Sequence, residues 1–260
     1  MRLRSGSLAV AAAVLFGAGG LGACGLLPGE TFEDDAVVSE AITSVRLDND
    51  SGRVELRGGK DLTEVSVHRS VDYRGDRPEG ATHRVENGVL VLGDCGGSCS
   101  VSYTVDLPAG LPVSGGTSAG SITLSEVGEV AVSTGSGSIT LDGVGEVAVT
   151  TGSGSITLNG VTGPVDARTS NGRITGRGLE GGPVRVQTSN GAVDLTVSAP
   201  QDVRAHTSNG AVELTVPAGR YRVSASTSNG EKDIGVTDDP AGKHRIELVT
   251  SNGDITVRPA

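Results

Sequence analysis

The stretches VRVQTSNGAVDLTV, residues 184–197, and VRAHTSNGAVELTV, residues 203–216, decide the fold of this chain. In each, a Thr-Ser-Asn-Gly phrase lies between two segments in which apolar and polar residues alternate. Alternation with a period of two and many β-branched residues predicts short strands that bury one face. The phrase predicts a tight corner, because Gly adopts backbone conformations closed to other residues and Asn tolerates the left-handed region better than most. Each unit therefore supplies two strands and a corner.

Related phrases recur through the second half of the chain. Eight copies follow one another in steps of 17 to 23 residues, and five of them read Thr-Ser-Asn-Gly. The copies open at Thr117, Thr134, Thr151, Thr169, Thr188, Thr207, Thr227 and Thr250. Such a period is typical of solenoids, in which each unit closes its core only by stacking on its neighbours.

Two ways of winding these strands fit the alternation: a meander of antiparallel hairpins, or a coil in which equivalent strands stack in parallel. The apolar offsets repeat so regularly that Thr would stack on Thr and Asn on Asn, as in an in-register parallel ladder. We therefore predict an all-β fold, a parallel β-solenoid with two short strands per 17–23-residue repeat, over residues 114–258. Gly176 and Lys232 break the apolar pattern, and the coil at Lys232 is expected to bulge or to end the stack early.

Residues 43–113 carry a looser version of the same alternation. We predict a less regular β section that forms early coils or a cap of the solenoid, which would protect its first open edge. A loop at residues 72–81 and a turn between Cys95 and Cys99 interrupt it. A separate small β-domain is the alternative.

The start of the chain has the layout of a secretory signal: Arg2 and Arg4, an apolar run over residues 8–18, and then Leu-Gly-Ala-Cys at residues 21–24. These last four residues resemble the lipobox of bacterial lipoproteins. The resemblance implies a signal peptide over residues 1–23, an acyl chain such as palmitate on Cys24, and a location on the extracytoplasmic side of the cell membrane. An ordinary cleaved signal with an incidental Cys is the alternative.

Charge and cysteine usage narrow the function further. Residues 24–42 are acidic and predict a flexible tether. Cys95 and Cys99 remain for a disulfide, which exported domains keep, whereas the scattered His residues argue against zinc. The net charge is −10, and removal of residues 1–23 takes away two Arg and no acid, which makes it −12. This sign argues against nucleic acid as a partner.

Two columns of polar residues are candidate sites. Asp194, Glu213 and Asp233 follow the corner Gly by three residues, and on consecutive coils they could hold Ca²⁺; a solvated acidic face is the alternative. A second column consists of the corner asparagines, which are expected to form an internal or corner amide ladder, with a ligand-binding row as the alternative. Its members are Asn171, Asn190, Asn209, Asn229 and Asn252.

The lipobox, the irregular first section and the repeated T-S-N-G-x-[IV]-x-[LV] strands together resemble the bacterial DUF4097 family, which carries the label "putative adhesin". The resemblance covers roughly residues 43–258 and implies a β-solenoid at the cell envelope with no catalytic residues and no cofactor. We therefore expect a non-enzymatic envelope lipoprotein, attached to the membrane through Cys24, that acts as a structural or adhesin-like module toward a cell-wall or surface-protein partner. A ligand-binding module for cell-wall glycan or Ca²⁺ is one alternative. A carbohydrate-active β-helix enzyme is another, although no pair of converging carboxylates is evident.

Overall fold

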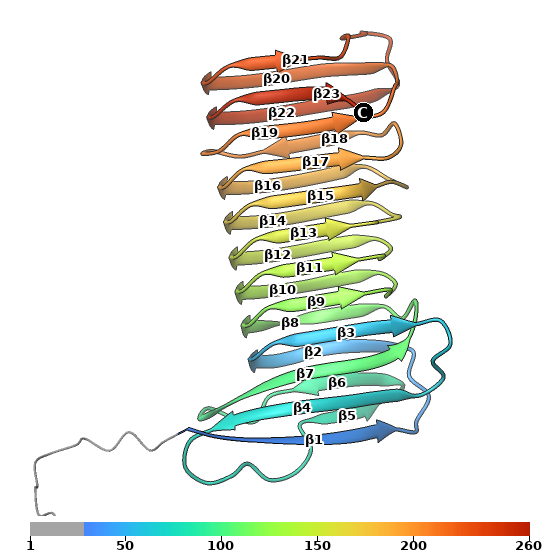
Figure 1. Cartoon of the computed structure of the whole chain (residues 1–260), viewed down its shortest axis with the longest axis vertical. Helices are drawn as coiled ribbons and strands as arrows, with labels where there is room; N and C mark the ends of the chain where they lie inside the picture. The colour runs from blue at the N-terminus through green and yellow to red at the C-terminus, as the bar shows by residue number, and fades with distance from the viewer. Residues whose placement is uncertain (1–28) are drawn as a thin grey trace, which may run out of the picture.

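Two long sheets face each other along the whole of the molecule, in a computed structural model that describes residues 29–260 (Figure 1). The predicted signal peptide of residues 1–23 and the predicted lipidation site Cys24 lie outside the described residues. Within residues 29–260 there are strands and turns but no helix, and hence none that is long and apolar enough to cross a membrane. The predicted all-β solenoid is confirmed.

The strands are short and divide evenly between the sheets. The twelve-stranded sheet has the order β1 (Glu30–Val38), β4 (Val65–Tyr73), β7 (Cys99–Pro108), β3 (Val54–Gly59), β9 (Ile122–Ser125), β11 (Ile139–Asp142), β13 (Ile156–Asn159), β15 (Ile174–Leu179), β17 (Val193–Val197), β19 (Val212–Val216), β23 (Ile255–Pro259) and β21 (Lys232–Ile234). The eleven-stranded sheet has the order β5 (His83–Glu86), β6 (Val89–Gly93), β2 (Ser44–Ser51), β8 (Val113–Ala119), β10 (Val130–Ser136), β12 (Val147–Ser153), β14 (Val165–Asn171), β16 (Val184–Asn190), β18 (Val203–His206), β22 (His244–Asn252) and β20 (Tyr221–Asn229).

From β8 to β19, each repeat gives one strand to each sheet and stacks in parallel on the next. Thr134 pairs with Thr151 in one sheet, and Ile139 pairs with Ile156 in the other, so identical residues lie over one another as predicted. The aliphatic side chains point between the sheets, and Ile156 is fully buried. Each such side chain contributes about 1.5–3 kcal/mol by burial, and it does so only because the coils on both sides cover it.

The coil with Gly176 keeps its place in the stack through a local rearrangement. The pairing of β15 with β17 shifts register between Gly176 and Leu179. The Leu179 side chain is fully buried, and a Cβ added to Gly176 would lie 2.7 Å from its Cδ1 atom. Leu179 therefore fills the space that the missing side chain at position 176 would have occupied.

Residues 43–113 lie in the same two sheets and the same hydrophobic core as the regular coils. β2 and β3 stack directly on β8 and β9, and β6 and β7 add a further parallel rung. Beyond them the direction reverses, because β4 and β5 pair antiparallel with β7 and β6. This section is thus continuous with the solenoid, but its strands are not stacked in sequence order.

The first described strand corrects one prediction. β1 pairs antiparallel with β4 along its whole length, from Glu30 opposite Tyr73 to Val38 opposite Val65. The predicted flexible tether over residues 24–42 is therefore wrong for residues 30–38. This strand forms the outer edge of the twelve-stranded sheet at the N-terminal end (Figure 1).

The order of the coils is also exchanged at the other end. β22 and β23 lie between β18 and β19 on one side and β20 and β21 on the other, although they come last in the chain. Lys232 explains this order, because it pairs with Ile255 and thus stands at a position that faces the core in other coils. An unpaired Lys between two coils would be costly to bury, and at the end of the stack it is exposed. The coil at Lys232 therefore ends the stack in space but not in sequence.

Candidate functional site

The Thr of each corner phrase points inward, and its hydroxyl group has a defined task. Thr151 is buried, and its Oγ1 donates a hydrogen bond of 2.9 Å to the carbonyl oxygen of Gly137, the corner Gly of the preceding coil. The same bond recurs at Thr134, Thr169, Thr188, Thr207, Thr227 and Thr250. This hydrogen bond was not predicted, although the even offset of Thr from the buried residues was the available signal. A buried hydroxyl without such a partner would destabilise the corner.

The corner Gly is required by close packing between coils. A Cβ added to Gly154 would overlap the carbonyl oxygen of Gly137 below it, and a Cβ at Gly137 would overlap Gly120 in the same way. The expected reason for the neighbouring Asn is wrong, since among the described non-Gly residues only Asn87 and Glu126 have positive φ. The corner Asn must therefore be favoured by its side chain.

That side chain forms an amide ladder on the outside of the corner. Asn190 Nδ2 donates to Asn171 Oδ1 at 3.0 Å, and Asn209 Nδ2 donates to Asn190 Oδ1 at 3.0 Å. The ladder continues from Asn252 to Asn209 and from Asn229 to Asn252, which follows the order of the coils in space. All five residues are solvent-exposed. The ladder is thus a surface feature that ties five coils together.

The outer face of the eleven-stranded sheet changes character at β14. β8, β10 and β12 contain no charged residue, whereas the next five strands in space contain five Arg and two acidic residues. The arginines are Arg168, Arg185, Arg204, Arg245 and Arg222, one from each of β14, β16, β18, β22 and β20. We call this surface the arginine face.

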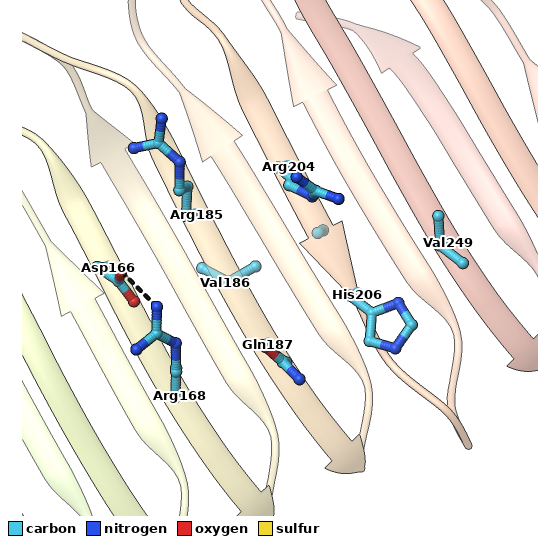
Figure 2. Close-up of a pocket in the computed structure, with 9 residues that line it drawn as sticks. Asp166, Arg168, Arg185, Val186, Gln187, Arg204, His206 and Val249 are labelled. Atoms are coloured by element: carbon cyan, nitrogen blue, oxygen red, sulfur yellow. Dashed lines mark hydrogen bonds and ion pairs between the residues drawn. The ribbon is translucent and has the colours of Figure 1, made fainter.

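A shallow hollow of about 390 Å³ lies on the arginine face (Figure 2). Arg185 and Arg204 lie at one end, while Arg168, Gln187 and His206 lie at the other. An ion pair of 2.8 Å joins Arg168 to Asp166. Guanidinium, amide and imidazole groups all donate hydrogen bonds, so the hollow is suited to an oxyanion.

A family model now places these features among known proteins. It matches residues 104–258, which is more than half of the chain, and its description is Toastrack DUF4097. The chain belongs to the DUF4097 Toastrack family. Its Toastrack stack contains the regular coils, the amide ladder and the arginine face.

A solved structure shares this architecture at low sequence identity. A putative adhesin from Parabacteroides distasonis has a TM-score of 0.52 at 12% identity, over 89% of this chain and 98% of that one. A putative lipid binding protein from the same organism has a TM-score of 0.49 at 14% identity, over 85% and 96% of the two chains. A search of curated proteins finds no match. At these identities the likeness concerns the fold alone.

The acidic column of the Toastrack stack is not continuous. Asp194 pairs with Glu213, but Glu213 then pairs with Thr256, and Thr256 with Asp233. The expectation of three consecutive carboxylates is wrong, because the exchanged coil order inserts a Thr between two of them. Within residues 29–260 no group of three or more His, Cys, Asp or Glu residues is arranged to hold a metal ion.

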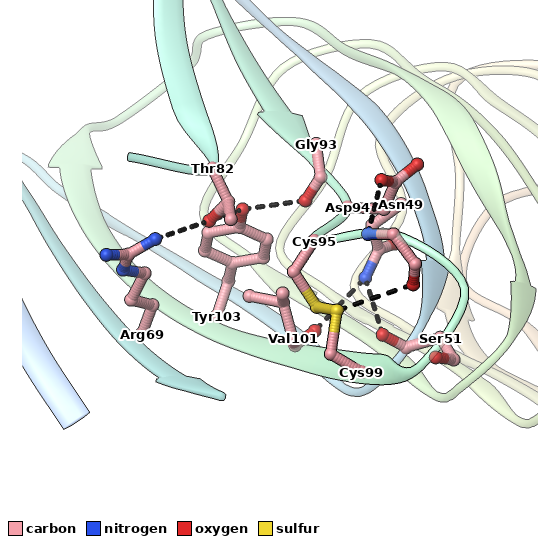
Figure 3. The surroundings of a disulfide bond; sticks show 11 residues. Asn49, Ser51, Arg69, Thr82, Gly93, Asp94, Cys95, Cys99, Val101 and Tyr103 are labelled. Atoms are coloured by element: carbon pink, nitrogen blue, oxygen red, sulfur yellow. Dashed lines mark hydrogen bonds between the residues drawn. A yellow bond between two sulfur atoms is a disulfide. The ribbon is translucent and has the colours of Figure 1, made fainter. Parts of the chain in front are cut away.

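Cys95 and Cys99 form a disulfide with a Cα–Cα distance of 5.9 Å at the N-terminal end of the Toastrack stack (Figure 3). It closes the turn that leads into β7. The disulfide lies beside a polar network, and neither Cys lines a hollow of the arginine face. The role of the disulfide is therefore to hold the turn.

The polar network contains Arg69, Thr82 and Tyr103 (Figure 3), and Arg69 links it to β1. Arg69 Nη2 donates to Asp34 Oδ2 at 2.7 Å and Nη1 donates to Thr82 Oγ1 at 3.2 Å. The Tyr103 hydroxyl lies 2.6 Å from that of Thr82 and donates to the Gly93 carbonyl at 2.7 Å. Hydrogen bonding from Arg69 lowers the pKa of Asp34, while burial raises the pKa of Tyr103 to about 12. The network explains why the acidic segment around Asp34 is a strand.

Proposed function

We propose that this protein is an exported, lipid-anchored envelope protein whose Toastrack stack acts as a non-catalytic interaction module, in the manner of an adhesin or an envelope scaffold. The observation that carries the proposal is the pair of long sheets with polar outer faces. The hollow of about 390 Å³ on one of these faces is shallow. Its lining residues offer hydrogen-bond donors but no nucleophile and base arranged for catalysis. The similarity in fold to a putative adhesin from Parabacteroides distasonis supports the same class of function.

Attachment through Cys24 would set the orientation of the module. The lipobox-like residues 21–24 support an acyl anchor, and β1 begins only six residues after Cys24. At about 3.3–3.6 Å per residue, such a connection spans at most roughly 20 Å. The N-terminal end of the stack would therefore lie close to the bilayer and the arginine face would extend away from it.

The disulfide adds an independent argument for export. Bonds of this kind persist in oxidising compartments and are rare in the cytosol. Cys95 and Cys99 form such a bond in the structure. An extracytoplasmic location is thus consistent with both the start of the chain and its N-terminal turn.

The test is the fate of the chain in a bacterial host. We expect the unaltered protein to enter the detergent phase on phase separation and to carry a lipid mass on its first residue, because an acylated Cys dominates its partition. Cys24→Ala should be recovered in the aqueous phase, whereas Cys95→Ala/Cys99→Ala should partition as the unaltered protein does. Equal partition of the unaltered protein and Cys24→Ala would overturn the proposed anchor.

A further inference from the structure

Positive charge is concentrated on the arginine face of a chain that is acidic as a whole. The net charge of the chain is −10, yet β14, β16, β18, β22 and β20 contain five Arg and only two acidic residues. The five neighbouring strands of the twelve-stranded sheet, β15, β17, β19, β23 and β21, contain three basic and three acidic residues. The charges on the opposite side of the same coils are therefore balanced, so the excess of positive charge is confined to the arginine face.

The register makes this excess unfavourable for folding. Arg185 pairs directly with Arg204 on one adjacent strand, and like charges opposite each other destabilise a sheet, while Asp166 lies opposite Arg185 on the other adjacent strand. Glu247 relieves part of the repulsion by ion pairs of 3.1 Å to Arg204 and 3.5 Å to Arg245. Among residues 29–260, neither Arg185 nor Arg222 has a carboxylate within ion-pair distance. The stack thus keeps two unpaired guanidinium groups that its own stability does not require.

The hollows on this face join into one track. The hollow in Figure 2 shares Arg185 and Arg204 with a second one of about 210 Å³, which reaches Arg245. A third, of about 310 Å³, begins at Arg245 and ends at Arg222. The five strands span about 19 Å along the stack at roughly 4.8 Å per rung. These hollows are also lined by Asp166, Asp202, Glu247 and Asp238. The track therefore offers guanidinium groups repeated along a line, with carboxylates between them.

From this geometry we infer that the arginine face binds a linear anionic glycopolymer of the envelope, whose phosphate or carboxylate groups lie along the track and engage Arg185, Arg204 and Arg222. The inference deepens the proposed function and rests on it for the identity of the polymer. Guanidinium groups bind both kinds of oxyanion through paired hydrogen bonds. Several shallow contacts in a row suit a chain with repeated charges better than one small anion.

Other polyanions fit less well. Single-stranded nucleic acid is usually held by aromatic side chains on which its bases stack, and no Phe, Trp or Tyr lines these three hollows. An anionic membrane is usually bound with help from exposed apolar side chains, and the only large hydrophobic residues exposed in the described chain are Val37 and Leu62, both at the N-terminal end. Recognition would thus depend on the oxyanions themselves.

The experiment compares two variants of equal charge in the full chain carrying Cys24→Ala. Arg185→Gln/Arg204→Gln removes two positive charges from the track, while Arg177→Gln/Arg258→Gln removes two exposed ones from the twelve-stranded sheet. Binding is measured calorimetrically with polygalacturonate and with a poly(glycerol phosphate), which separate carboxylate from phosphate. Dextran, an anionic phospholipid vesicle and a single-stranded DNA are measured in parallel.

We expect at least one anionic glycopolymer to bind, with affinity that falls at high salt. Arg185→Gln/Arg204→Gln should weaken it at least about tenfold, because charge-assisted hydrogen bonds are lost, and Arg177→Gln/Arg258→Gln should change it less than about twofold. The melting temperature of Arg185→Gln/Arg204→Gln should change little, since the loss of a repulsive pair offsets the loss of the exposed ion pair between Arg204 and Glu247. Binding of neither glycopolymer, equal loss in the two variants, or preference for DNA or vesicles would overturn the inference. None of these outcomes depends on lipidation, so the anchor of the proposed function is tested separately.

Discussion

The coils from β8 to β13 and the N-terminal section from β1 to β7 share two sheets but are stabilised differently. The coils contain no aromatic residue and take part in no ion pair among the described residues, and each is covered by a near copy of itself. The N-terminal section contains Phe32, Tyr73 and Tyr103, a disulfide and four Arg–carboxylate ion pairs. Repetition stabilises an interior coil, whereas an end that lacks a neighbour needs specific side-chain contacts.

The largest expected effect is the loss of an interior aliphatic side chain. Ile156→Asp would place a carboxylate between two coils that offer it no partner, so we expect the free energy of unfolding to fall by more than about 4 kcal/mol. Thr157→Asp, one residue further on the outward face, should cost less than about 1 kcal/mol. Thermal and urea melts measure both, and similar losses would contradict the assigned facing.

A second substitution tests the close approach of the corners. Gly154→Ala would force a Cβ against the Gly137 carbonyl, and we expect a loss of about 2–3 kcal/mol because the coils must move apart. Gly97→Ala is the matched control, since nothing lies within 4 Å of the added atom. If urea melts of the two variants coincide, the corner does not require Gly for packing.

The N-terminal section should respond to loss of a single hydroxyl. Tyr103→Phe removes the hydrogen bond to Gly93, and we expect a loss of about 1–2 kcal/mol at pH 7. Because the folded pKa is raised to about 12 from its ordinary 10, the neutral phenol is favoured by folding; this contribution is present below pH 10 and is lost as the pH rises to 12.

Stability measured between pH 9 and 12 should therefore fall more steeply in the unaltered protein than in Tyr103→Phe. Ile156→Val serves as a control that lowers stability without removing a titrating group. An unchanged pH dependence in Tyr103→Phe would show that this buried phenol does not couple folding to protons.

The smallest effect concerns the surface ladder. Asn209→Asp removes the amide that donates to Asn190, and we expect a loss of about 0.5–1 kcal/mol because the bond is solvent-exposed. Ser208→Ala changes the adjacent residue, whose side chain takes no part in the ladder. A melting temperature of Asn209→Asp equal to that of Ser208→Ala would assign the ladder no energetic role.

The position of a residue can be predicted from the sequence where adjacent repeats carry the same residue type at the same offset. Ile156 could be assigned to the core and Asn190 to a column, because the same spacing recurs in adjacent copies. The same spacing predicted that Thr stacks on Thr, but the bond of Thr151 to Gly137 depends on the distance between two coils. The period of the sequence shows which residues face the core, whereas hydrogen bonds between coils can be identified only from the three-dimensional stack.

The ends could not be predicted in this way. The pairing of Asp34 with Arg69 joins residues far apart in the chain, and without it an acidic segment resembles a tether. The exchange of the last two coils follows from Lys232, whose polar character was visible although its consequence for coil order was not. The arginine face was not predicted, and the hollow over Arg185 and Arg204 depends on side-chain positions.

The exchanged coils also decide what can be attached to this protein. The last strand, β23, is flanked by β19 and β21, and Ala260 N–H donates to the Val216 carbonyl, so the carboxyl terminus leaves the side of the stack and not its tip (Figure 1). A tag or fluorescent protein fused there would project sideways, one rung below the top, and would leave the terminal rung free. To lengthen the column with designed repeats, new sequence would have to be inserted in the turn at residues 235–243.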